Sequence, residues 1–138
     1  MKTLINFHVY LLDQVILIPS KRDEDGLWVE VLPPFTVTPL TVAEMERCVT
    51  EIINISDELS SDQPWDGNSG SVWRNTKVLL GVRWFDDDSW QILPFHLWKY
   101  ENEKAEWQPD RSKQLRIPAS PRSVEEVAHA LVQMLSEK

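Results

Sequence analysis

Two runs of strand-forming residues, Val78–Phe85 and Trp90–Trp98, are separated by only four polar residues. β-Branched and aromatic side chains favour strands, and the intervening Asp86-Asp87-Asp88-Ser89 has the composition of a tight turn. A connection this short joins antiparallel neighbours, because a parallel crossover needs a dozen residues or more. The sequence therefore predicts an antiparallel β-hairpin as the framework of the fold.

Further strand patterns lie on both sides of this hairpin. Residues 4–18 alternate loosely between apolar and polar positions, with a turn expected at Asp13-Gln14. Leu27–Leu32 reads as another strand that ends at Pro33-Pro34, because proline cannot donate a hydrogen bond to a sheet. The stretch around Trp107 and the short run 114–117 are expected to add strands near the end of the chain.

Two amphipathic helices complete the pattern. Thr41 with Glu44, and Ser123 with Glu126, have the spacing of a capping box, in which each side chain satisfies a free backbone amide. Apolar residues then recur every three to four positions, as on one buried helix face. They are Val42, Met45, Val49, Ile52 and Ile53 in the first helix, and Val124, Val127, Leu131 and Leu135 in the second. We therefore expect helices over about 41–58 and 123–137.

These elements predict an α+β fold in which an antiparallel sheet is packed against two main helices. A length of 138 residues suits one domain, 1–138, and suffices for a hydrophobic core without disulfide or metal staples. The polar stretch 60–76 lacks periodicity and is expected to be a long loop.

The net charge of −8 bears on the choice of partner. Nucleic acid is excluded as the expected partner, because its phosphates are bound by clustered Lys and Arg. The same charge favours a basic protein, although acidity can also serve solubility alone. Cys48 is the only cysteine, and residues 4–18 match neither a signal peptide nor a membrane span, so we expect a cytoplasmic protein without membrane association.

No pattern of catalytic, cofactor-binding or metal-ligating residues stands out. Four glycines form no phosphate-binding loop, and one cysteine with three scattered histidines cannot close a zinc site. We interpret His8, His96 and His129 as ordinary strand or helix residues, and Cys48 as a packing thiol. The run Asp86–Asp88 lacks the alternation and glycine bend of a calcium loop, so a solvated turn is expected.

The strongest candidate site is a protein-binding surface of tryptophans set among carboxylates. Aromatic rings supply desolvated contact area and charges steer the partner. The candidate residues are Asp62, Trp65, Asp66, Trp73, Asp86, Asp87, Asp88, Trp90, Glu101, Glu103, Glu106 and Trp107. The alternative is that the tryptophans lie in the core while the acids decorate turns, and for Trp84 and Trp98 we expect the core.

The second half of the chain resembles immunity proteins of bacterial contact-dependent growth inhibition systems. The resemblance runs from Val78-Leu79-Leu80-Gly81-Val82 through the Trp90 strand to Arg116-Ile117-Pro118 and the helix that starts Ser123-Val124-Glu125-Glu126. It implies a cytoplasmic protein that binds and neutralises the C-terminal domain of a cognate toxin, usually a nuclease, without catalytic residues or cofactors of its own.

Two other functions stay open from the sequence. One is an intracellular adaptor or regulatory module that binds a partner unrelated to toxins. The other is a small enzyme, with His96 or His129 and the Asp86–Asp88 run as its acid–base groups. A strongly perturbed histidine in a concave pocket would favour the enzyme.

Overall fold

The predicted central hairpin forms in the computed structural model, which describes residues 1–66, 75–99 and 105–137. Strand β5 (Val78–Phe85) pairs antiparallel with β6 (Trp90–Lys99), and Trp84 lies opposite Trp90 next to the turn. Two strands from the predicted 4–18 segment, β1 (Thr3–Leu11) and β2 (Val15–Arg22), add antiparallel to β5 through β1. The prediction of an α+β domain with an antiparallel sheet is confirmed.

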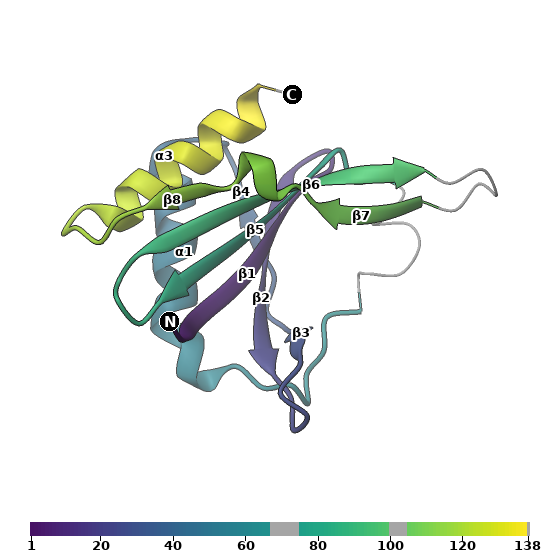
Figure 1. Cartoon of the computed structure of the whole chain (residues 1–138), viewed down its shortest axis with the longest axis vertical. Coiled ribbons are helices and arrows are strands. Elements are labelled where there is room, and N and C mark those ends of the chain that lie inside the picture. The colour runs from purple at the N-terminus through teal and green to yellow at the C-terminus, as the bar shows by residue number, and fades with distance from the viewer. Residues whose placement is uncertain (67–74, 100–104, 138) are drawn as a thin grey trace.

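Shorter strands extend the sheet at both edges. Within the described residues the sheet has eight strands, and its main order is β3-β2-β1-β5-β6-β7. β3 (Trp28–Glu30) and β4 (Phe35–Val37) both pair with β2, whereas β7 (Ala105–Pro109) and β8 (Leu115–Ile117) both pair with β6. The sheet curls, and the β6–β7 hairpin projects away from the rest of the molecule (Figure 1).

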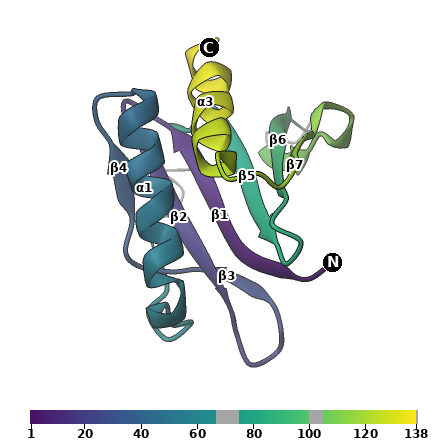
Figure 2. The same ribbon diagram turned by 90° about the vertical axis from the view of Figure 1, so that its left-hand side faces the viewer.

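Two helices, α1 (Val42–Ile55) and α3 (Ser123–Ser136), lie side by side on one face of this sheet (Figure 2). A single 3₁₀ turn, Ser56–Glu58, follows α1. The main core lies between the helices and the sheet. It combines alternate strand residues such as Phe7, Leu17 and Val82 with helix residues such as Ile52 and Leu131. Cys48 is buried there, as predicted for a packing thiol.

The two predicted capping boxes had different outcomes. The Thr41 hydroxyl accepts a hydrogen bond of 3.2 Å from the backbone N–H of Glu44, so Thr41 caps α1 as predicted. The prediction that Ser123 caps α3 is wrong, because Ser123 lies inside the helix and Arg122 occupies the cap position. The buried Ser123 hydroxyl instead accepts a hydrogen bond from the indole N–H of Trp90. Its place in the core therefore prevents it from capping the helix.

The opposite face of the sheet has a smaller apolar cluster of its own. Tyr10, Ile18, Leu79 and Trp107 are buried there, with Trp65 and Phe95 packed against them. No helix within the described residues covers this face. Because strand side chains alternate between faces, every second residue of β1, β5 and β6 belongs to this second surface.

Candidate functional site

The acidic turn of Asp86, Asp87 and Asp88 connects β5 to β6. The backbone N–H of Asp88 donates to the Phe85 carbonyl, and the N–H of Phe85 donates to the Ser89 carbonyl, each over 2.9 Å. Asp88 has a φ of 65°, a left-handed conformation that aspartate tolerates better than most residues. The three carboxylates are exposed, so the predicted solvated turn is confirmed.

The turn is stabilised by its own polar side chains. The Asp87 carboxylate accepts hydrogen bonds from the Ser89 hydroxyl and the Ser89 backbone N–H, which lower the pKa of Asp87. Arg116 donates to the same hydroxyl over 3.3 Å, and its guanidinium lies over the Phe85 ring. The carboxylate of Asp87 is therefore held by hydrogen bonds within the turn. Asp86 and Asp88 are exposed and leave their charges available to a partner.

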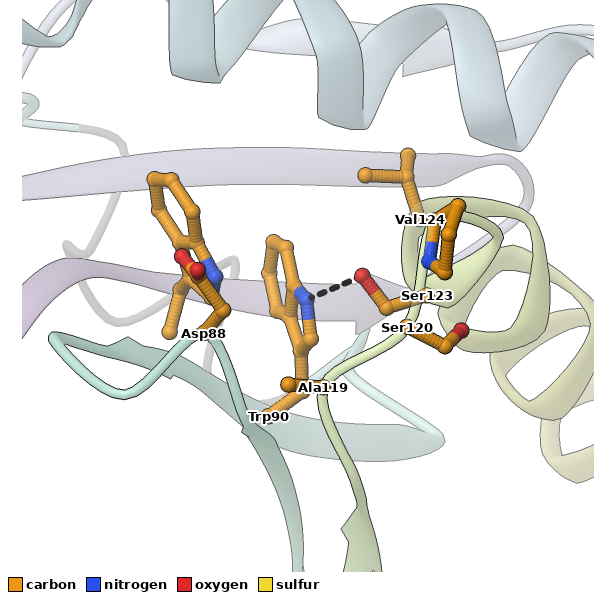
Figure 3. Close-up of a pocket in the computed structure, with 8 residues that line it drawn as sticks. Asp88, Trp90, Ala119, Ser120, Ser123 and Val124 are labelled. Atoms are coloured by element: carbon orange, nitrogen blue, oxygen red, sulfur yellow. Dashed lines mark hydrogen bonds between the residues drawn. The ribbon is translucent and has the colours of Figure 1, made fainter.

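An open pocket of about 470 Å³ lies between this turn and the start of α3. Its aromatic wall is a stacked pair, with the Trp84 and Trp90 ring centroids 5.6 Å apart. Figure 3 shows Asp88 to one side of the Trp90 ring and Ser123 to the other, where Trp90 donates its hydrogen bond of 3.3 Å. The remaining lining is small or apolar: Ala119, Ser120, Pro121 and Val124. A carboxylate and an aromatic ring at one cavity suit a cationic side chain.

Trp90, predicted as a partner-binding residue, lies behind the pocket without exposed surface, and its role in binding stays a prediction. Its side chain is fully buried on the helix side of β6, and its only polar atom is satisfied by Ser123. Trp84 packs against the core as predicted, although it stays partly exposed. Trp98 was expected in the core, and that prediction is wrong. The residue is 50% exposed because it lies on the projecting β6–β7 hairpin.

A second group of predicted residues lies elsewhere on the molecule. Trp65 packs on Tyr10 with their ring centroids 5.5 Å apart, and Trp107 is buried in the same cluster at 9% exposure. Asp62, Asp66 and Glu106 are exposed. Trp73, Glu101 and Glu103 fall outside the described residues.

The predicted surface therefore divides into two. Leu79, which belongs to the Trp65 and Trp107 cluster, is on the same strand as Phe85 at the acidic turn. At about 3.3 Å per residue, the six-residue separation places the two groups roughly 20 Å apart. The two groups are therefore separate surfaces, and the acidic turn is the one that we consider further because Asp88 lines a defined pocket.

The histidines proposed for an enzyme do not meet the acidic turn. His96 is six positions along β6 from Trp90, or roughly 20 Å. His129 lies on α3 beside a groove lined by Leu115, Glu125, Glu126 and Gln133, which contains no residue of the turn. An acid–base site made from these groups is therefore not assembled in the structure.

His8, by contrast, has an environment that the sequence interpretation missed. It lines a cavity of about 170 Å³ on the face of the sheet opposite the helices. Its Nδ1 atom is buried 3.7 Å from the Glu30 carboxylate, too far for a hydrogen bond. Burial first, and the charge of Arg83 second, lower its pKa to about 4, so the ring is neutral at pH 7. The sequence did contain a signal for this environment. Along β1, Asn6, His8 and Tyr10 alternate with the apolar residues Ile5, Phe7 and Val9, which places the two sets on opposite faces of the sheet.

Glu30 takes part in this environment through Tyr10, whose hydroxyl donates a hydrogen bond of 2.6 Å to the Glu30 carboxylate. Burial raises the pKa of Glu30, an effect that this hydrogen bond partly offsets. Burial also raises the pKa of Tyr10, and the negative charge of Glu30 adds to the effect.

Within residues 1–66, 75–99 and 105–137, no group of three His, Cys, Asp or Glu side chains is placed to hold a metal ion. No helix in these ranges combines the length and apolar character needed to cross a bilayer.

Comparison with known proteins returned no match among family models, curated proteins or solved structures. The resemblance to immunity proteins therefore stays a prediction.

Proposed function

We propose that this chain is an immunity protein that binds and neutralises a cognate toxin domain, using the acidic turn and its adjoining pocket. The observation that carries the proposal is the exposed Asp88 at an open cavity walled by Trp84, with Asp86 exposed in the same turn. This arrangement presents negative charge and an aromatic surface together, as a protruding Lys or Arg side chain requires.

The charge of the whole chain supports the same partner. At −8 the protein attracts basic surfaces and repels polyanions. Nuclease domains are basic around their substrate sites because they bind phosphate backbones. An acidic protein that occupies such a surface competes with nucleic acid for it, and it needs no chemistry of its own.

The rigidity of the turn also supports a binding role. Asp87 and Ser89 fix the turn by hydrogen bonds, and the backbone of β5 and β6 holds both of its ends. A preorganised charged loop loses little conformational entropy on binding, so more of the interaction free energy appears as affinity.

The test is the association rate with the toxin domain encoded beside this gene. The double variant Asp86→Asn/Asp88→Asn removes two charges and keeps residues that adopt the turn, because Asn tolerates a positive φ. Asp13→Asn/Asp25→Asn is the matched control, since these residues are exposed in other turns. We expect the first variant to associate about tenfold more slowly at low salt, and the control to change little. Equal rates for both variants would reject the acidic turn as the binding surface.

A further inference from the structure

We propose that the cavity around His8 is a binding site for a small planar carboxylic acid. The site lies on the face of the sheet opposite the helices, whereas Trp84 and the acidic turn pocket belong to the helix side. The inference is therefore independent of the proposed toxin binding.

Gly81, in the middle of β5, is one of the residues that line the cavity. Gly81 lies between His8 of β1 and Leu93 of β6 in the sheet register. A Cβ atom at position 81 would lie 3.2 Å from Cε2 of Phe95 and 3.8 Å from Cδ2 of His8. The Phe95 ring therefore packs close over the Gly81 backbone, at a strand position where glycine otherwise weakens a sheet.

Two polar side chains at one end of the cavity, those of Asn6 and Arg83, make no hydrogen bond or ion pair with other described residues. Asn6 is only 6% exposed, yet its side chain makes no hydrogen bond to the described residues. Arg83 forms no ion pair within the described part of the chain, although the protein has an excess of carboxylates. A guanidinium and an amide that meet at one cavity suit a carboxylate, which accepts hydrogen bonds with both oxygens.

The other walls are apolar and aromatic. Trp28, Leu93 and Phe95 line the cavity, and the Arg22 guanidinium lies 4.7 Å from the centre of the Trp28 ring. A volume of about 170 Å³ is below the usual range for drug-sized ligands, so it admits about one ring with a substituent. The neutral His8 ring adds one further hydrogen-bonding group without adding charge.

Benzoate is the probe for this site, and benzamide is its neutral counterpart of nearly the same shape. Both would be titrated into the full chain while NMR follows the ring protons of His8, with those of His96 and His129 as internal references. We expect benzoate to shift the His8 signals alone and to bind at least about tenfold more tightly than benzamide, because an ionic hydrogen bond is lost in the amide.

Two variants test the assignment of the residues. Arg83→Gln removes the cation from an exposed position that forms no ion pair with the described residues, and it should weaken benzoate binding about tenfold. Arg111→Gln, on an exposed turn, should not. Gly81→Ala should also weaken binding, because its methyl group would press on the Phe95 ring, which lines the cavity. Circular dichroism of each variant confirms that the fold is retained.

The proposal is overturned if benzoate leaves the His8 signals unchanged, or if Arg83→Gln binds it as well as the wild type does. If inorganic phosphate displaces bound benzoate and binds as tightly as benzoate does, the aromatic walls of the site do not contribute to recognition. Tighter binding of the capped peptide acetyl-Gly-Glu-Gly-amide than of benzoate would instead assign the site to a carboxylate of a protein partner.

Discussion

The buried position of His8 predicts a loss of stability in mild acid. Its pKa falls from 6.5 to about 4 on folding, so the unfolded chain takes up the proton first as the pH decreases. The stabilisation by the neutral ring is fully present above pH 6.5 and is lost progressively between pH 6.5 and 4. Each pH unit between the two pKa values corresponds to about 1.36 kcal/mol, so complete titration removes roughly 3 kcal/mol.

The expected loss is smaller in practice, because the His8 side chain is 25% exposed and solvent screens part of the effect. We therefore expect roughly 2 kcal/mol of free energy of unfolding to depend on His8 between pH 7 and 4.5. Glu30 acts in the opposite direction: its raised pKa makes the folded protein bind a proton more readily, which adds stability as the pH falls. The Glu30 contribution is present in both wild type and a His8 variant, so comparison of the two isolates His8.

The assay is urea unfolding at pH 7, 5.5 and 4.5 for wild type, His8→Gln and the exposed control His129→Gln. The difference in unfolding free energy between wild type and His8→Gln should shrink by roughly 2 kcal/mol from pH 7 to 4.5, whereas the His129 control should follow the wild type. If the wild type and His8→Gln lose stability in parallel, His8 is not held neutral by burial.

Other substitutions test the fold and the acidic turn. Trp90→Ala should destabilise the protein by about 3–5 kcal/mol in urea unfolding, because the ring is fully buried; a loss below about 1 kcal/mol would contradict its place in the core. Thr41→Ala should cost about 1 kcal/mol as loss of a helix cap, measured in the same way, and no loss would reject the cap. Asp88→Gly should raise stability by up to about 1 kcal/mol, because glycine adopts a φ of 65° without strain, and yet should slow toxin association; a loss of stability would contradict the assigned turn.

The sequence predicted the elements whose signals are local. The central hairpin, the turn at Asp13-Gln14 and both helices follow from alternation, turn composition and helical spacing, and the structure has them within a few residues. β4 was missed because Phe35–Val37 is a three-residue strand set between prolines, where only pairing with β2 makes it a strand.

The candidate site was harder to predict because it depends on which face of the sheet each residue occupies. Trp90 and Trp98 are on the same strand, but Trp90 lies beneath α3 and Trp98 lies on a projecting hairpin. Composition alone cannot distinguish these positions. The His8 cavity needed the register, because only the pairing of β1 with β5 shows that Asn6, His8 and Arg83 lie together on one face of the sheet.

Growth rescue is the decisive experiment on toxin neutralisation. The chain would be co-expressed with the toxin domain encoded beside its gene, as wild type, as Asp86→Asn/Asp88→Asn and as the Asp13→Asn/Asp25→Asn control. We predict that the wild type and the control restore growth and co-purify with the toxin domain, while the acidic-turn variant protects poorly and is recovered in a weaker complex. A toxin domain that kills cells despite the wild-type chain, without binding it, would contradict the account.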